Sequence, residues 1–330
     1  MPEDRLVAVS YPADDELEKI NIETLGEHAR LAFLPRLSGG GERMAALRQA
    51  EILLALHPSA ELPDGAFGEA RALRMIQLLS AGADHIDFRA IPERVVLASN
   101  VGAYAKPMSE HVMAMTLALA KRLPQGHAEL ARGEFDQHTP SRMLDGAVCA
   151  ILGFGGIGQA TARLMRAFGA RVHAVNTSGR TEEAVEFVGT LADLDRVLSA
   201  ADVLVIALPL TAATRGLIGH RELGLMKPDA ILVNVARGAI VDERALYEHL
   251  LANPRLRAGI DAWWQEPLQG GEFSVRYPFF ELPNLLGSPH NSGIVPRILP
   301  AAARQAAGNV RSYLRGGPVA GVARREDYLS

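Results

Sequence analysis

The sequence predicts an α/β fold built from two parallel-sheet domains, one flavodoxin-like and one Rossmann-like. Three observations predict it. The chain has 330 residues, which suits two domains of common size better than a single core. Short apolar runs alternate with helix-length polar stretches, which is the pattern of βαβ units. A glycine-rich turn at residues 153–158 directly follows one apolar run and precedes a predicted helix.

The predicted strands fall into two series along the chain. The first series predicts strands at Leu6 to Val9, Leu31 to Leu34, Ile52 to Leu56, Met75 to Leu79 and Val95 to Ala98. The second series predicts strands at Val148 to Leu152, Arg171 to Val175, Val203 to Leu208, Ile231 to Val235, Ala258 to Asp261 and Leu285 to Leu286. Helical segments separate the strands within each series, so each series predicts a parallel sheet of its own.

Two predicted helices relate these series to domains. The stretch from Pro107 to Leu123 is rich in Met, Ala and Leu and predicts a buried helix between the two series. The Ala- and Arg-rich stretch from Pro300 to Arg315 predicts a helix that returns to the first domain. We therefore expect the flavodoxin-like domain at residues 1–100 and 292–330, and the Rossmann domain at residues 101–291.

Composition narrows the class of protein. The net charge is −4 and Lys and Arg form no basic cluster, which argues against nucleic acid as a partner. No apolar run is long enough to span a membrane and the first residues do not resemble a secretion signal, so we expect a cytoplasmic protein. The single cysteine, Cys149, lies in an apolar run and is expected to be buried. The histidines show no metal-ligand spacing, so no metal is expected.

The glycine turn reads Gly153-Phe154-Gly155-Gly156-Ile157-Gly158. A tight turn of this kind lets the backbone approach a pyrophosphate and points the N-terminal amides of the next helix at its negative charge. The alternative is that the glycines serve close packing only. The order of strand, turn and helix favours a dinucleotide site.

The strand predicted at residues 171–175 ends at Asn176, where an acidic residue would normally bind the adenosine ribose. Thr177, Ser178 and Arg180 follow and offer neutral donors and one guanidinium. A carboxylate would repel a 2′-phosphate, and this segment has none. The pattern favours NADP over NAD, and the alternative is a turn whose Arg180 is merely solvated.

Arg237, Glu266 and His290 each follow a predicted strand of the second series. The carboxyl ends of parallel strands meet at one edge of a sheet, where ligands bind. Reduction of a 2-oxo acid needs a cation for the substrate carboxylate, a proton donor and a group that holds that donor. A guanidinium, an imidazole and a carboxylate meet these needs, so we expect an active-site cleft between the two domains.

These segments together resemble the D-isomer-specific 2-hydroxyacid dehydrogenase family over nearly the whole chain. The resemblance rests on the glycine turn, Asn234-Val235-Ala236-Arg237-Gly238, Asp261 to Pro267 and Ser288-Pro289-His290, in the family's order and spacing. It implies an NAD(P)-dependent enzyme that reduces a small 2-oxo acid such as glyoxylate or hydroxypyruvate. Arg237 would anchor the substrate, His290 would exchange the proton, and Glu266 would hold that imidazole.

The resemblance also implies further contacts. The amides of Ala81 and Gly82 would hold the substrate carboxylate, together with Arg237 and His290. Asp261 would meet the nicotinamide carboxamide. Beyond the glycine turn and the segment 176–180, the implied cofactor contacts are Met108, Leu208, Pro209, Thr214, Val235, Ala236, Arg237, Asp261, His290 and Gly293. The family commonly forms homodimers through the segment that corresponds to about Leu123 to Leu144.

Some features depart from the family pattern. Tyr104 and Pro107 replace small or polar residues, and an aromatic insert runs from Gly270 to Phe280. His57-Pro58 stands where the family places a specificity loop, so the substrate stays open. Two alternatives are an enzyme of the formate or phosphite dehydrogenase type and a dinucleotide-sensing, corepressor-like interaction protein. Glu266 argues against formate, because the formate enzymes lack this glutamate.

Two residue pairs near the expected site have a simpler interpretation. Trp263 and Trp264 are expected to pack in a core or interface, where each indole N–H needs only one partner. Glu110 and His111 are neighbours on a predicted helix and point to different faces, so packing is expected for them and not an acid–base role.

Overall fold

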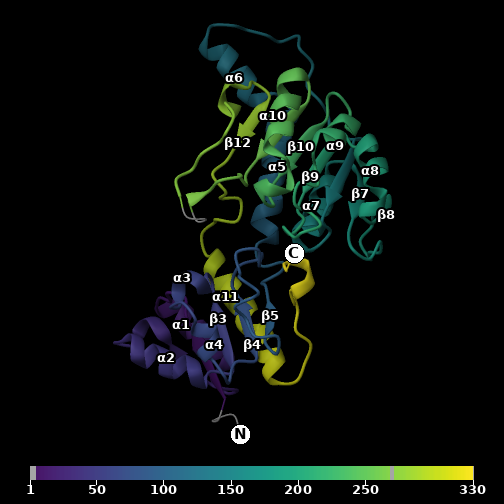
Figure 1. Cartoon of the computed structure of the whole chain (residues 1–330). Helices are drawn as coiled ribbons and strands as arrows, with labels where there is room; N and C mark the ends of the chain where they lie inside the picture. The colour runs from purple at the N-terminus through teal and green to yellow at the C-terminus, as the bar shows by residue number, and fades with distance from the viewer. Residues whose placement is uncertain (1–4, 268–270, 330) are drawn as a thin grey trace. The chain divides into compact units, whose positions relative to one another are not determined.

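The computed structural model describes residues 5–267 and 271–329. The chain forms two compact units: unit 1, residues 1–104 and 295–330, and unit 2, residues 105–294. Each unit contains one sheet whose named strands all pair in parallel (Figure 1). The predicted fold class of two parallel-sheet α/β domains is confirmed. The division of the chain falls a few residues beyond the expected boundaries at 100 and 291.

The sheet of unit 1 has five strands in the order β2-β1-β3-β4-β5. The strands are β1 (Leu6–Val9), β2 (Arg30–Phe33), β3 (Ile52–Ala55), β4 (Met75–Leu78) and β5 (Val96–Ala98). The helices are α1 (Asp15–Leu25), α2 (Gly40–Gln49), α3 (Pro58–Glu61), α4 (Ala66–Glu69) and α11 (Ile298–Leu314). The strand order reverses between β1 and β3, and in such sheets ligands bind beyond the carboxyl ends of the strands.

Helix α11 joins the end of the chain to unit 1. Its buried face consists of small side chains, including Ala303 and Ala307, so its backbone can lie close to α1 and to strands β3 and β4. Helix α1 begins after Asp14, whose carboxylate accepts a hydrogen bond from the Leu17 amide at 2.9 Å. The tail helix therefore completes the core of unit 1.

The sheet of unit 2 has seven strands in the order β12-β11-β10-β9-β6-β7-β8. The strands are β6 (Val148–Leu152), β7 (Arg171–Val175), β8 (Phe187–Gly189), β9 (Val203–Ile206), β10 (Ile231–Asn234), β11 (Arg257–Ile260) and β12 (Leu285–Gly287). The helices are α5 (Ala105–Ala120), α6 (Leu123–Ala131), α7 (Gly156–Ala167), α8 (Leu194–Ala200), α9 (His220–Leu225) and α10 (Glu243–Ala252). Short 3₁₀ helices span Leu34–Arg36, Leu191–Asp193, Gly238–Ile240, Phe279–Glu281 and Arg325–Asp327 over both units.

The sheet of unit 2 is buried on both faces. Along β6, Ala150 and Leu152 belong to one hydrophobic cluster, and Cys149 and Ile151 belong to another. Side chains of a strand alternate between faces, so a strand covered on both sides reads as a continuous apolar run. Burial raises the pKa of the Cys149 thiol to about 12, which fits its predicted buried position.

The structure differs from the sequence prediction at several ends of elements. Strand β8 was not expected, because its two apolar residues directly follow the charged Glu186. Helix α5 begins at Ala105, before Pro107, since proline is tolerated in the first turn of a helix. Strand β9 ends at Ile206 and not at Leu208, shortly before Pro209.

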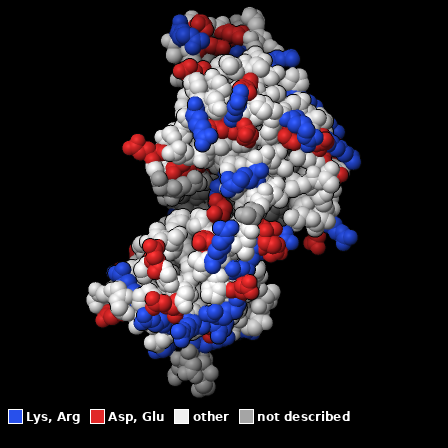
Figure 2. Space-filling model, viewed as in Figure 1, with Lys and Arg blue, Asp and Glu red and all other residues white. Residues whose placement is uncertain are grey.

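Charged side chains of both signs are interspersed on the face of each unit that Figure 2 shows. Within residues 5–267 and 271–329, no helix combines the length and the apolar character that a membrane crossing requires.

Candidate active site

His290 and Glu266 are in direct contact. Glu266 follows β11 and His290 follows β12, and these two strands pair side by side. Nδ1 of His290 lies 2.6 Å from Oε2 of Glu266. Glu266 is 6% exposed, and its other oxygen accepts a hydrogen bond from the Trp263 amide at 2.7 Å. The side chain of His290 is 31% exposed, so a ring held by a buried carboxylate still reaches solvent.

Asp261 holds the turn that carries His290. Its Oδ1 accepts hydrogen bonds from the Ser288 hydroxyl at 2.5 Å and from the Asn291 amide at 3.1 Å. Its Oδ2 accepts one from the Ser292 amide at 3.2 Å, and its carbonyl oxygen accepts one from the His290 amide at 2.9 Å. We call residues 288–292 the histidine turn. The fully buried Asp261 thus binds this turn at four points, three through its carboxylate and one through its backbone carbonyl.

Two properties of the histidine turn follow from this arrangement. Burial alone would raise the pKa of Asp261, but hydrogen bonds from Ser288 and Ser292 and the nearby His111 outweigh burial and lower it. His290 has a φ of 50°, in the left-handed region that non-glycine residues seldom adopt. The bonds to Asp261 on both sides of His290 hold the backbone in this conformation.

Arg237 sits on a turn that Asn234 holds at the end of β10. Asn234 is fully buried, accepts a hydrogen bond from the Ala236 amide at 3.0 Å and donates one to the Arg237 carbonyl at 3.0 Å. Gly238 lies directly on the next segment, because a Cβ there would be 2.3 Å from the carbonyl carbon of Trp263. The glycine of the Asn-x-Ala-Arg-Gly pattern therefore allows the Arg237 turn to pack closely against the segment that carries Glu266.

The glycine turn leaves room beside the start of α7. A Cβ at Gly153 would lie 2.5 Å from the Ala207 carbonyl, and one at Gly158 would lie 2.1 Å from the Gly153 oxygen, so both glycines are required for packing. A Cβ at Gly155 would meet no atom within 4 Å. Helix α7 has no side-chain cap and no acidic residue in its first turn. These residues fit a pyrophosphate, since open space adjoins the unpaired amides of a helix N-terminus.

The segment after β7 is organised by Asn176. Its Oδ1 accepts hydrogen bonds from the amides of Ser178 at 3.1 Å and Gly179 at 2.7 Å, and its Nδ2 donates to the Arg180 carbonyl at 2.8 Å. The Asn176 amide group is therefore used within the turn. Thr177, Ser178 and Arg180 are exposed, and no carboxylate follows the strand within this turn.

The other predicted cofactor residues of unit 2 lie around these turns. Leu208 adjoins the glycine turn, because its amide would be 2.6 Å from a Cβ at Gly153. The Thr214 hydroxyl is buried and donates to the Pro209 carbonyl at 2.7 Å, so it shapes the loop after β9. Met108 and Ile157 are partly buried against the core, Val235 and Ala236 are buried, and Gly293 directly follows the histidine turn.

Ala81 and Gly82 belong to unit 1, in the loop after β4. The Ser80 hydroxyl donates to the Gly82 carbonyl at 2.9 Å, and the Asn100 amide donates to the Ser80 carbonyl at 2.8 Å. No acceptor within the described chain takes the amide hydrogens of Ala81 and Gly82. This loop can therefore offer two backbone donors to an anion.

Two features that depart from the family pattern also lie in unit 1. The ring of His57 meets that of His85 edge to face, with centroids 5.1 Å apart. The His57 amide donates to Glu61 Oε1 at 2.6 Å, which fixes the chain after β3. The Tyr104 hydroxyl donates to the Leu79 carbonyl at 3.1 Å.

The aromatic insert packs on the two tryptophans. Gly270 lies outside the described residues; from residue 271 onward, Phe279 stacks on Trp264 at 5.2 Å between ring centroids, and Phe280 meets Trp263 at 5.3 Å. Trp263 donates its indole N–H to the Ser288 carbonyl at 2.8 Å, and Trp264 donates to the Val241 carbonyl at 2.6 Å. The predicted packing role of both tryptophans is confirmed.

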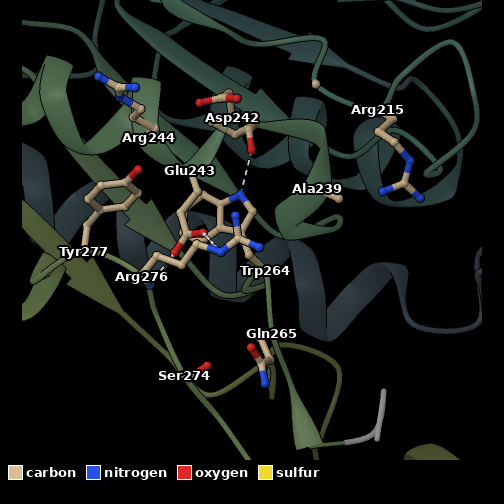
Figure 3. A pocket seen from close by; sticks show the side chains of 12 residues that line it. Arg215, Ala239, Asp242, Glu243, Arg244, Trp264, Gln265, Ser274, Arg276 and Tyr277 are labelled. Atoms are coloured by element: carbon tan, nitrogen blue, oxygen red, sulfur yellow. Dashed lines mark hydrogen bonds and ion pairs between the residues drawn. The ribbon is translucent and has the colours of Figure 1, made fainter. Parts of the chain in front are cut away.

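Figure 3 shows a cavity of about 390 Å³ in unit 2, beside Trp264. Its wall includes Arg215, Ala239, Asp242 and Arg276, but neither Glu266 nor His290. The contacts described above, and not this cavity, define the candidate site. Within the described residues, no three His, Cys, Asp or Glu side chains are grouped to hold a metal ion.

The sequence prediction missed His111 and Ser288. His111 Nε2 on α5 lies 3.0 Å from the Ser288 hydroxyl, and that hydroxyl donates to Asp261. Packing was expected for both Glu110 and His111; His111 is partly buried, but Glu110 is exposed. Only the fold shows that the two distant segments meet.

Comparison with known proteins identifies the family of this chain. Residues 113–292 match the family model described as "D-isomer specific 2-hydroxyacid dehydrogenase, NAD binding domain". The chain is 33% identical to the glyoxylate reductase of Thermococcus gammatolerans, over 68% of each chain. It is 29% identical to the D-3-phosphoglycerate dehydrogenase of Methanocaldococcus jannaschii, over 94% of this chain but only 57% of that relative's length.

Solved structures show the same fold. A family protein from Aeromonas salmonicida is 29% identical, with a TM-score of 0.77 over 98% of this chain and 99% of that one. A family member from Xanthobacter autotrophicus, solved with NADPH and MES, is 25% identical, with a TM-score of 0.77 over 99% of this chain and 100% of that one. With an NAD(P)-binding domain at residues 113–292, this chain belongs to the D-isomer specific 2-hydroxyacid dehydrogenase family, whose members are oxidoreductases acting on CH–OH donors.

Proposed function

We propose that this protein is an NAD(P)-dependent D-2-hydroxyacid dehydrogenase that reduces a small 2-oxo acid of the glyoxylate or hydroxypyruvate kind. One observation carries the proposal: His290 Nδ1 lies 2.6 Å from a buried Glu266 oxygen, on a ring that still reaches solvent. This is the arrangement of a general acid whose orientation is fixed by a carboxylate. The glyoxylate reductase among the relatives supports the substrate class.

Each residue then has a defined task. When bound, the nicotinamide cofactor supplies the hydride for the 2-oxo carbon. His290 gives a proton from Nε2 to the carbonyl oxygen of the substrate, while Glu266 holds Nδ1 and stabilises positive charge on the ring. Arg237 binds the substrate carboxylate and polarises the carbonyl. We also propose that the amides of Ala81 and Gly82, in the loop after β4, offer donors to a carboxylate.

We propose NADP as the preferred cofactor. The pyrophosphate would lie over the glycine turn, where Gly155 leaves open space. Asn176 and Ser178 donate and accept inside their own turn, and the exposed Arg180 offers a guanidinium to a 2′-phosphate. The NADPH complex of the Xanthobacter autotrophicus relative supports this choice.

The test is a panel of substrates, and turnover of each is measured from the absorbance of the reduced nicotinamide. Glyoxylate, hydroxypyruvate and phenylpyruvate would each be offered with NADPH and with NADH. We expect substrate-dependent oxidation that is faster with NADPH. Binding of NADPH without turnover of any 2-oxo acid would contradict the proposal and would favour a dinucleotide-sensing interaction protein. Formate and phosphite would also be offered with NADP⁺ and with NAD⁺, because their oxidation needs the oxidised cofactor, and turnover of these alone would favour that other enzyme class.

We also propose a homodimer formed through residues 123–144. This segment carries exposed apolar side chains, including Leu130, Phe135 (78% exposed) and Met143 (66% exposed). In Figure 1, α6 and the connection after it extend from unit 2 away from its sheet. Large exposed apolar side chains gathered on one segment are typical of an interface. Light scattering should give a dimer for the native chain and a monomer for Phe135→Glu, and a native monomer would contradict the proposal.

A further inference from the structure

Behind the His290–Glu266 pair lies a second series of hydrogen bonds. His111 Nε2 on α5 is 3.0 Å from the Ser288 hydroxyl, which is 2.5 Å from Asp261 Oδ1. Asp261 is fully buried, and His111 is itself 3.7 Å from the same Oδ1. These contacts connect a helix near the start of unit 2 to the turn near its end.

The direction of each bond follows from counting hydrogens. The pKa of Asp261 lies below its ordinary value, because hydrogen bonds outweigh its burial, so the carboxylate is ionised at neutral pH and only accepts. The Ser288 hydroxyl has one hydrogen and gives it to Asp261. The contact between His111 and Ser288 therefore requires that His111 Nε2 carries a hydrogen and donates it.

The consequence appears at His290. The two carboxylate oxygens of Asp261 also accept hydrogen bonds from the amides of Asn291 and Ser292, which follow His290 in the chain. Its carbonyl binds the His290 amide, and His290 has the left-handed φ of 50°. The orientation of the Asp261 carboxylate thus determines the backbone conformation of the histidine turn. The hydrogen bonds of Ser288 and His111 fix that orientation.

We propose that His111 is a positioning residue, which acts through Ser288 and Asp261 to hold the histidine turn so that His290 meets Glu266. The effect on turnover rests on the proposed function, but the effect on ring geometry does not. A displacement of about 1 Å in a reacting group can cost about 100-fold in rate, so a modest shift of the turn is enough to matter.

The experiment compares three variants. His111→Leu removes the donor, His111→Gln restores an N–H near the position of Nε2, and Glu110→Gln is the control on the exposed face of the same helix turn. The first readout is the ¹⁵N spectrum of the histidine rings in the protein without cofactor, with His111 and His290 assigned by loss of their signals on substitution. The second readout is kcat and KM with the preferred 2-oxo acid.

We expect a protonated Nε2 on His111 and a protonated Nδ1 on His290 in the native protein. His111→Leu should change the ring signals of His290 and lower kcat by up to about 100-fold, with a smaller change in KM. His111→Gln should restore both, and Glu110→Gln should change neither.

Two results would overturn the inference: an unprotonated Nε2 on native His111, or unchanged His290 signals in His111→Leu. If His111→Leu does not fold, Ser288→Ala removes the same connection and should change the His290 signals in the same way; unchanged signals there would equally refute it. A native protein inactive with every 2-oxo acid would contradict the proposed function alone, because the ring spectra would still decide the role of His111.

Discussion

The glycine turn and the histidine turn stand at the same edge of the unit 2 sheet and are built in opposite ways. The glycine turn follows β6 and leaves open space at Gly155, where a Cβ would meet no atom within 4 Å. The histidine turn follows β12 and is bound at four points by one buried residue, Asp261, through its carboxylate three times and its backbone carbonyl once. The first turn keeps backbone donors available for a ligand, and the second uses its donors to fix one imidazole.

This difference predicts how each turn fails. A site made by leaving space is damaged when atoms are added, and a site made by hydrogen bonds is damaged when atoms are removed. A buried carboxylate that loses its donors keeps the cost of burial without the bonds that offset it. The following substitutions test this contrast.

Removal of the guanidinium at Arg237 should have the largest effect of these four. Its turn is held like the histidine turn, by the buried side chain of Asn234. Arg237→Ala should lower kcat/KM by about 100- to 1,000-fold, through a lower kcat and a higher KM, because a charged donor to the reacting group is lost. Arg215→Ala, an exposed arginine on the wall of the cavity in Figure 3, is the matched control. Equal losses in the two variants would contradict the role of Arg237.

Addition of a methyl group at Gly155 should weaken cofactor binding without harm to the fold. Gly155→Ala should raise the Kd of NADPH at least about tenfold and leave Tm unchanged, because its Cβ meets no protein atom. Gly153→Ala should lower Tm, since its Cβ would lie 2.5 Å from the Ala207 carbonyl at a φ of 94°. Titration of cofactor fluorescence and thermal melts measure the two effects. The contrast fails if Gly155→Ala binds NADPH as the native protein does.

Loss of the guanidinium at Arg180 should affect one cofactor only. Arg180→Ala should raise the Kd of NADPH by about tenfold, because a charge-assisted bond to the 2′-phosphate is lost. The Kd of NADH should not change. A similar weakening of both cofactors would show that Arg180 does not read the 2′-phosphate.

Treatment of Cys149 with an alkylating reagent should have the smallest effect. The thiol lies inside β6, which leads into the glycine turn, and burial raises its pKa to about 12. The reactive thiolate is therefore scarce at pH 8, and mass spectrometry should find no alkylation of the folded protein but full alkylation after unfolding. Rapid alkylation with loss of cofactor binding would show that β6 opens in the native state.

The sequence was sufficient for those parts of the molecule that depend on local pattern. The continuous apolar run of β6 and the valines of β7 predict strands, and the observed ends of both strands coincide with the predicted ones. The edge strand β8 pairs with β7 and begins directly after Glu186, and two apolar residues beside charged ones carry little signal.

In the candidate site, too, the sequence predicts residues that lie in local motifs but not contacts between distant segments. Glu266 and His290 could be predicted as residues because motifs mark them. The Ser288–His111 contact depends on where α5 packs, and the internal use of Asn176 depends on its turn. Side chains that act through distant neighbours leave no local pattern, so these contacts required the structure.

The most direct test of the central claim follows a labelled hydride. NADPH with deuterium at the transferable position would be incubated with hydroxypyruvate, and NMR would locate the label in the product. The native protein should place one deuterium on C2 of D-glycerate, and His290→Gln should bind NADPH normally but form labelled product about 100- to 10,000-fold more slowly. A His290→Gln variant as fast as the native protein, or a label at any other carbon, would contradict the account.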